Sequence, residues 1–268
     1  MLLNSLILIT AFSGSVLAGL FGGGAGLIFT PAIFLFLSYN NPEANYVMQT
    51  TITTMITSML LPGLIACFKQ VSYRHVDWHI IRWSLLPIVF GSFVGCILML
   101  SISSKFLTYI FAIATLFLAI RSVLSLYRQS HDEYMQSLKP GWFFRYIGSF
   151  SLGIISIVSG SASFVVPFYQ RAGVNIKSAI GATTVTVWCY SLVAAITMIL
   201  LGIKKVGLPQ GNIGYLNYSY LMLFMLPTIP GIIIGANLSN FFSERTLKIL
   251  FTFLLFIISV TMLVKVNI

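Results

Sequence analysis

The first 37 residues form an apolar run without a charged residue, and five glycines fall within it between Gly19 and Gly26. A continuous helix of this length would measure about 55 Å at 1.5 Å per residue, whereas the hydrocarbon core of a bilayer is about 30 Å thick. Glycine costs roughly 1 kcal/mol in a helix interior. We therefore expect the run to break within residues 19–31. Irregular backbone at membrane depth is tolerated only where protein covers it or where it lines a wet cavity.

The composition excludes a soluble domain. Hydrophobic residues make up 58% of the 268 residues and charged residues only 7%, and mean hydropathy is +0.97. The net charge of +10 does not indicate a nucleic-acid partner, because the basic residues are scattered through short connections. They are typical of positive-inside topology signals and of contacts with anionic membrane lipids. Cys67, Cys96 and Cys189 lie in apolar runs and read as small buried hydrophobes, so no disulfide or zinc site is expected.

Apolar length predicts an all-α polytopic membrane protein with about eight transmembrane helices in two repeated halves of four, with a broken first helix in each half. The expected spans are residues 3–37, 46–68, 83–100, 106–126, a fifth from about 143 that is interrupted at 158–163, then 176–201, 216–238 and 247–266. Residues 1–127 form the first half, 128–142 a cytoplasmic linker and 143–268 the second half. The first span lacks the basic n-region of a signal peptide, so we expect it to be retained.

The two halves share motifs at matching spacing. Gly24 and Pro31 are separated by the same distance along the chain as Gly160 and Pro167. The third spans align without gaps, with Leu86-Pro87, Gly91 and Gly95 matching Leu226-Pro227, Gly231 and Gly235. Over eight passes, the Lys and Arg positions predict that both termini are cytoplasmic, and they favour a parallel over an inverted repeat. A first span that turned back as a hairpin would instead place the N-terminus outside.

The two helix breaks are the candidate substrate site, because freed backbone amides and the positive end of a following half-helix favour an anion. Serine hydroxyls add donors at the second break, and a Gln-Thr-Thr run and a second Thr-Thr pair follow the breaks in the two halves. The expected substrate-binding residues are Gly22, Gly23, Gly24, Gly26, Gln49, Thr50, Thr51, Ser159, Gly160, Ser161, Ser163, Thr183 and Thr184.

Each of these features has a purely structural alternative. Small residues let membrane helices pack closely, and this is the favoured interpretation for Gly91, Gly95, Gly231 and Gly235. Threonine hydroxyls in a helix can simply bond the carbonyl four residues back. At the two breaks the number of small residues exceeds what packing needs, which favours function.

The acidic residues are informative by their positions. The five are Glu43, Asp77, Asp132, Glu133 and Glu244, and none lies near the middle of an expected span. A buried carboxylate relay of the kind used for proton or cation coupling is therefore not expected. An anion leaving an inside-negative cell gains about 2.3 kcal/mol per charge per 100 mV, which favours efflux.

Enzymatic chemistry has little support. His75 and His79 flank Asp77 and could form a metal pair, but a solvated connection is the favoured interpretation. No nucleotide-binding, metalloprotease or nucleophile-elbow motif is present,. We expect no catalytic residues, no metal and no cofactor.

On the glycine-rich break at residues 19–31, its weaker copy at 159–167, the Thr-Thr pairs and the Leu-Pro-x-x-x-Gly-x-x-x-Gly spans, the chain resembles the sulfite exporter TauE/SafE family of membrane permeases. The second break departs from the first in having one glycine, Gly160, among serines. The resemblance implies a plasma-membrane transporter of small anions, often sulfur-containing, such as sulfite or organosulfonates. The alternative is a non-transporting membrane scaffold or assembly factor whose glycines only pack helices.

Overall fold

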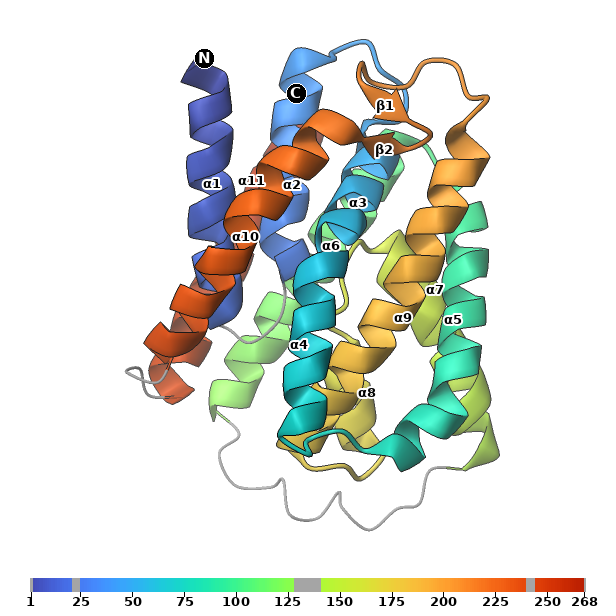
Figure 1. Ribbon diagram of the computed structural model, residues 1–268, viewed down its shortest axis with the longest axis vertical. Coiled ribbons are helices and arrows are strands. Elements are labelled where there is room, and N and C mark those ends of the chain that lie inside the picture. Colours follow the sequence, from blue (N-terminus) through green and yellow to red (C-terminus); the bar gives the residue numbers. More distant parts are fainter. Residues whose placement is uncertain (1, 21–24, 128–140, 240–243, 268) are drawn as a thin grey trace.

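The computed structural model describes residues 2–20, 25–127, 141–239 and 244–267, which are mostly helical (Figure 1). The helices are α1 (Leu2–Leu20), α2 (Ala25–Asn40), α3 (Val47–Ser58), α4 (Leu60–Ser72), α5 (Trp78–Leu100), α6 (Ser104–Tyr127), the π-helix η2 (Phe144–Gly148), α7 (Ser149–Val158), α8 (Val165–Arg171), α9 (Ile176–Gly202), α10 (Tyr218–Ser239) and α11 (Glu244–Asn267). A small antiparallel hairpin, β1 (Asn212–Ile213) and β2 (Leu216–Asn217), precedes α10.

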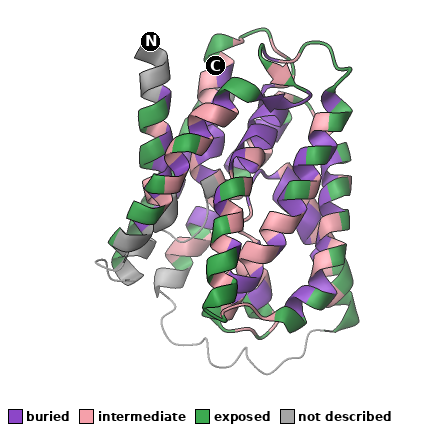
Figure 2. Ribbon diagram, viewed as in Figure 1, coloured by how far each residue is buried: buried purple, intermediate pink, exposed green. Residues whose placement is uncertain are grey.

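The helices confirm the predicted membrane class. Among the described residues, four helical segments are long and apolar enough to cross a membrane, namely Trp78–Leu100, Ser104–Leu124, Lys177–Gly202 and Tyr218–Gly235. The bent pair α3 and α4 counts as a fifth if it is one span. Figure 2 shows buried residues on the inner faces of the helices and exposed residues on the outer faces, where large apolar side chains such as Leu86 and Phe253 are exposed. Such an outer surface suits lipid.

The first predicted span turns back on itself. Helices α1 and α2 lie side by side in opposite directions (Figure 1), and a Cβ atom added to Gly14 would lie 2.9 Å from the Phe29 ring. Those two residues lie at similar distances along the chain from the break, which is the signature of a hairpin. The predicted helix break is real, but the chain reverses direction there.

The second predicted break also forms a hairpin. Helix α7 ends at Val158, and α8 returns toward the start of η2, where the Phe168 ring stacks on the Phe144 ring with centroids 4.5 Å apart. The two hairpins enter from opposite ends of the molecule (Figure 1). We call the end that holds both chain termini the terminal end, and the end where α6 stops and η2 begins the linker end.

The predicted parallel repeat is wrong. Helices that correspond in the sequence alignment of the halves run in opposite directions: α5 toward the terminal end and α10 away from it, α1 away from the terminal end and α7 toward it (Figure 1). Both termini share an end as predicted, but they lie opposite the linker end. The reason is that each broken helix returns to the side from which it entered, whereas the prediction counted each as one crossing.

The glycines of the aligned spans serve helix packing, as predicted. A Cβ atom on Gly91 would collide with the Phe150 carbonyl of α7, and one on Gly95 would lie 3.1 Å from the Ile154 Cα atom. A Cβ atom on Gly231 in α10 would collide with the Ser15 side chain of α1. Close backbone approach thus joins α5 to α7 and α10 to α1. The same role for Gly235 stays a prediction.

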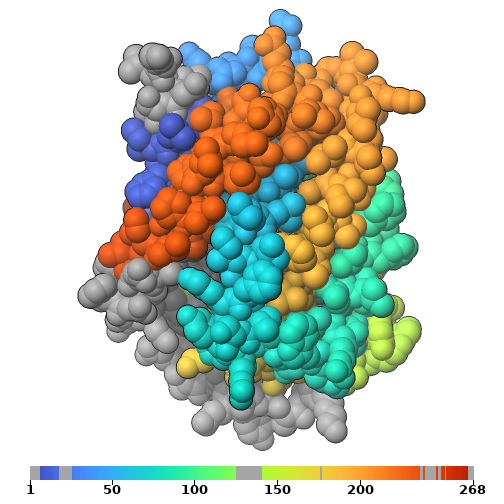
Figure 3. All heavy atoms as spheres, viewed as in Figure 1, coloured from blue at the N-terminus to red at the C-terminus, as the bar shows by residue number. Residues whose placement is uncertain are grey.

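Helix α3 forms the centre of the protein, and all of its residues except Thr57 are buried. The predicted second span is bent by 42° between α3 and α4. Pro62 explains the bend, because its ring clashes with the carbonyl four residues back and it has no N–H to donate. That carbonyl belongs to Ser58, the last residue of α3. On the face shown in Figure 3, α10 and α9 flank the α3–α4 segment.

Candidate functional site

The tips of the two hairpins meet beside α3. A Cβ atom added to Gly26, at the start of α2, would lie 3.0 Å from the Gly160 carbonyl oxygen and 3.1 Å from the Met55 Cε atom of α3. One added to Gly160 would lie 3.2 Å from the Ile52 side chain. The structure therefore brings the two predicted breaks together. Gly22, Gly23 and Gly24 lie outside the described residues.

The second tip is a capped helix end. The amide of Gly160 donates to the Ile157 carbonyl at 3.0 Å and the amide of Ser161 donates to the Ser156 carbonyl at 3.1 Å. With φ of +60° at Gly160, this is the Schellman arrangement that ends helices at a left-handed glycine. The amide of Ser159 donates to the Ile155 carbonyl at 2.9 Å. The expectation of free backbone amides is therefore wrong at these three positions, because the end of α7 uses them.

Hydroxyl groups remain as donors at this tip. The Ser159 hydroxyl is buried without a hydrogen-bond partner. The Ser161 hydroxyl donates to the Ser163 hydroxyl at 3.1 Å and accepts from the Ser163 amide at 3.3 Å. Since a buried unsatisfied hydroxyl costs about 1–3 kcal/mol, Ser159 is the serine best suited to donate to a ligand.

Two threonines on facing helices add to this set. Thr30 lies four residues after Gly26 in α2, and Thr51 lies four residues before Met55 in α3. Residues four apart share a helix face, so both threonines lie on the faces where α2 meets α3. Their hydroxyls are buried and unpartnered. Thr30 was missed by the sequence analysis, because a single threonine in an apolar helix carries no pattern.

Two other predicted residues of α3 have structural partners. The Gln49 side-chain amide donates to the Ile102 carbonyl at 2.8 Å and to the Met99 carbonyl at 3.4 Å, which ties α3 to the α5–α6 turn. The Thr50 hydroxyl accepts from the Asn212 side-chain amide at 3.0 Å. Of the side-chain atoms of Gln49 and Thr50, only the Gln49 Oε1 atom is buried without a hydrogen-bond partner.

The two Thr-Thr pairs are not brought together. Thr50 faces the β1–β2 hairpin at the terminal end, whereas the Thr184 carbonyl accepts a hydrogen bond from the Cys67 thiol of α4 at 3.5 Å, toward the linker end (Figure 1). The Thr184 hydroxyl donates to the Ile180 carbonyl at 2.9 Å, which is the purely structural alternative. The Thr183 hydroxyl is buried and unpartnered.

The β1–β2 hairpin closes the terminal end of α3, a feature the sequence analysis missed. Besides the Asn212 bond to Thr50, the backbone amide of Asn217 donates to the Thr54 hydroxyl at 3.0 Å. The Asn217 side chain donates to the Asn212 side-chain oxygen at 2.8 Å and holds the hairpin together. Burial raises the pKa of Tyr215 in the hairpin to about 12, with a smaller contribution from Tyr46.

A cavity of about 220 Å³ lies at the terminal end and is rich in amide side chains. Its lining residues are Ile7, Asn40, Asn41, Gln210, Asn217, Ser219, Tyr220 and Leu223. Asn217 belongs both to this cavity and to the hairpin that bonds α3. The cavity therefore borders the β1–β2 hairpin that bonds α3.

Asp77 has a structural role. It caps the start of α5, where its carboxylate accepts from the His79 amide at 2.9 Å and from the Ile80 amide at 3.2 Å. Among the described residues, no three His, Cys, Asp or Glu side chains form a cluster that could hold a metal ion.

Opposed discontinuous helices that meet at the centre of a multi-pass helical protein define a class, the membrane transporters. Residues 6–262 match the family described as "Sulfite exporter TauE/SafE", and the chain belongs to this family. It is similar to a "Probable membrane transporter protein" of Haemophilus influenzae, with 26% identity over 270 residues that cover 97% of each chain. A "Probable membrane transporter protein" of Methanocaldococcus jannaschii is 22% identical over 265 residues, 98% of this chain and 96% of that one. No solved structure matches the chain significantly.

Proposed function

We propose that the protein exports small anions across the plasma (cell inner) membrane, with sulfur oxyanions such as sulfite or organosulfonates as substrates. The observation that carries the proposal is the meeting of the two hairpin tips at Gly26 and Gly160 beside α3. Secondary transporters commonly bind substrate near the bilayer midplane, where discontinuous helices of two inverted repeats meet.

The helix packing supports two repeated halves of four membrane elements, each starting with a broken helix. Helix α1 packs on α10, and its counterpart α7 packs on α5, the counterpart of α10. Helix α2 packs on α3 as α8 packs on α9, and α6 packs on its own counterpart α11. Exchanging the halves therefore maps the main contacts onto one another, as an inverted repeat requires.

Hydroxyl groups are the proposed ligands at the hairpin tips. The buried, unpartnered hydroxyls of Thr30, Thr51 and Ser159 come from α2, α3 and the second tip. Each can donate to an anionic oxygen, and none introduces a fixed charge that would hold the anion tightly. An anion that crosses the whole membrane from an inside-negative cell to the outside gains about 2.3 kcal/mol per charge per 100 mV.

Access from the outside requires the β1–β2 hairpin to move away from α3. The hairpin bonds Thr50 and Thr54 of α3, which lie on either side of the proposed ligand Thr51 along the helix. Alternating access would combine release of this contact with rocking of the two halves.

Flux in proteoliposomes tests the proposal. We expect wild-type protein to transport radiolabelled sulfite or an organosulfonate, and we expect Thr51→Val and Ser159→Ala to reduce the rate at least tenfold. Thr108→Val is the matched control, because Thr108 is buried and its hydroxyl bonds its own helix carbonyl at Ser104. No flux of any sulfur oxyanion by folded wild-type protein would contradict the proposal and favour the scaffold alternative.

A further inference from the structure

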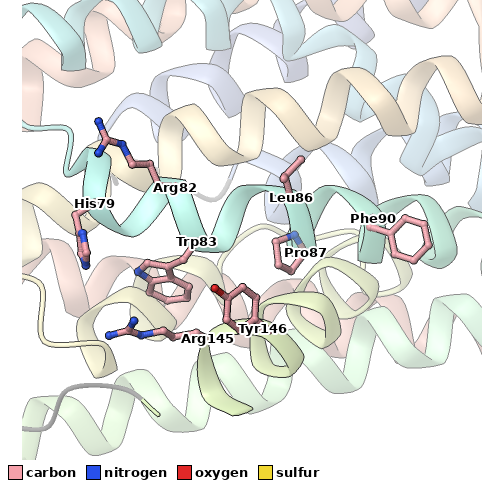
Figure 4. A pocket seen from close by; sticks show the side chains of 8 residues that line it. All are labelled: His79, Arg82, Trp83, Leu86, Pro87, Phe90, Arg145 and Tyr146. Atoms are coloured by element: carbon pink, nitrogen blue, oxygen red, sulfur yellow. The ribbon is translucent and has the colours of Figure 1, made fainter. Parts of the chain in front are cut away.

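A cavity of about 680 Å³ lies along one face of α5, between this helix and η2 (Figure 4). Its two ends differ in character. His79, Arg82 and Arg145 line one end, and Leu86, Pro87 and Phe90 line the other. The residues from α5 recur at spacings of three and four, so they share a helix face. None of the lining residues is acidic.

The basic end is built to meet an anion. The Arg145 guanidinium lies 5.8 Å from the centre of the Trp83 ring, which fixes it beside the cavity. Its Nε atom is buried without a hydrogen-bond partner. Arg82 is exposed, and no carboxylate of the described residues forms an ion pair with either arginine. A phosphate group would satisfy the Arg145 guanidinium by charge-assisted, bidentate hydrogen bonds, and Arg82 adds positive charge at the same end of the cavity.

The apolar end faces the membrane. Leu86 is 76% exposed and Phe90 is 62% exposed, on a helix long and apolar enough to cross a bilayer. Trp142 and Phe143 are exposed beside the start of η2, and aromatic residues of this kind are enriched where membrane meets water. The charged end thus lies at headgroup level, and the apolar end runs toward the hydrocarbon core.

The cavity lies at the linker end of the molecule, which is rich in basic residues. Outside the cavity, Lys69 and Arg74 lie at the end of α4, Arg171 ends α8 and Lys177 begins α9, all at this end (Figure 1). The positive-inside rule assigns such an end to the cytoplasm. Anionic phospholipids give the cytoplasmic leaflet its negative surface potential.

We propose that this cavity is a binding site for one anionic phospholipid of the cytoplasmic leaflet. The phosphate would bind the Arg145 guanidinium beside Trp83, with Arg82 adding positive charge at the rim, and an acyl chain would follow Leu86, Pro87 and Phe90 along α5. A free inorganic anion could use the two arginines but would leave the exposed apolar wall unused. Because α5 packs on α7, the bound lipid would also brace the second hairpin.

Lipid retention tests the site in detergent-solubilised full-length protein. Native mass spectrometry and thermal unfolding would be measured with phosphatidylglycerol, with phosphatidylcholine of the same acyl chains, and with inorganic phosphate. We expect retention of one phosphatidylglycerol, at least tenfold weaker binding of phosphatidylcholine, and no stabilisation by phosphate at equal concentration. The double variant Arg82→Gln/Arg145→Gln should weaken phosphatidylglycerol binding at least tenfold.

Two further variants keep the test decisive. Lys204→Gln/Lys205→Gln removes the same charge at the terminal end and should leave phosphatidylglycerol binding unchanged. Arg82→Gln alone changes an exposed side chain, so it should reduce binding without unfolding the protein. Equal binding of both lipids, equal loss in the Lys204/Lys205 control, or the same stabilisation by phosphate would overturn the lipid assignment.

Discussion

Gly160 has a left-handed backbone conformation and also lies where the two hairpin tips meet. Its φ of +60° is accessible to glycine but costs other residues about 1–2 kcal/mol,, and a Cβ atom there would press on Ile52 at 3.2 Å. We expect Gly160→Ala to lower thermal stability, and Gly160→Leu to abolish flux while membrane insertion is kept. Gly141→Ala is the control, because nothing lies within 4 Å of a Cβ atom there. Loss of insertion in Gly160→Leu would favour a packing role alone.

A second prediction concerns Gly91, where α5 packs closely against α7. A side chain there would meet the Phe150 backbone carbonyl, which cannot move without shifting α7. Overpacking of this kind lowers the free energy of unfolding by about 1–3 kcal/mol or more. We therefore expect Gly91→Leu to elute as an aggregate in size-exclusion chromatography. Leu98→Phe adds bulk on an exposed position of the same helix and should remain monodisperse. Equal behaviour of the two variants would contradict close packing of α5 on α7.

Single residues show where sequence reasoning stops. The excess of small residues predicted the break at Gly160, but the hydrogen bonds that cap α7 depend on the path of the chain after the helix. The pairing in sequence of Thr183 and Thr184 resembled that of Thr50 and Thr51, yet the structure places Thr50 at the terminal end and Thr184 toward the linker end. The distance along a chain does not reveal the direction in which it crosses a membrane.

At the scale of elements, the β1–β2 hairpin and α3 form a testable unit. The Asn212–Thr50 bond is partly buried, so a double-mutant cycle of Asn212→Ala and Thr50→Val should give a coupling of about 0.5–1.5 kcal/mol. The Thr57 hydroxyl donates to the Thr53 carbonyl of its own helix, so Asn212→Ala and Thr57→Val should be additive. Thermal unfolding measures both cycles. Additivity in the first cycle would mean that the hairpin does not hold α3.

The helix breaks were predictable, but their geometry was not. A 37-residue apolar run is too long for one crossing,, and two helices that cross or a hairpin that returns are equally compatible with its length. Pro62 carried a signal for the bend between α3 and α4 that the apolar length of the span concealed. The β1–β2 hairpin has only two residues in each strand, which is too short for an alternating pattern.

At the scale of the whole molecule, the hairpins decide which side of the membrane each end faces. At the linker end lie Lys69, Arg74, Arg82, Arg121, Arg145, Arg171, Lys177, Arg245 and Lys248, and at the terminal end lie Lys105, Lys204, Lys205 and Lys265. The positive-inside rule then predicts that the linker end faces the cytoplasm and that both termini lie outside. This orientation is the reverse of the one predicted for the termini from eight simple crossings.

Cysteine labelling in intact cells distinguishes the two orientations. In a variant that lacks Cys67, Cys96 and Cys189, Val206→Cys would report the terminal end and Arg74→Cys the linker end; Val206 is 90% exposed and Arg74 is also exposed. We expect a membrane-impermeant maleimide to label Val206→Cys in intact cells and Arg74→Cys only after permeabilisation, because the reagent cannot cross the bilayer. The opposite pattern would place the basic linker end outside. It would also remove the cytoplasmic leaflet as the source of a lipid for the Arg82–Arg145 cavity.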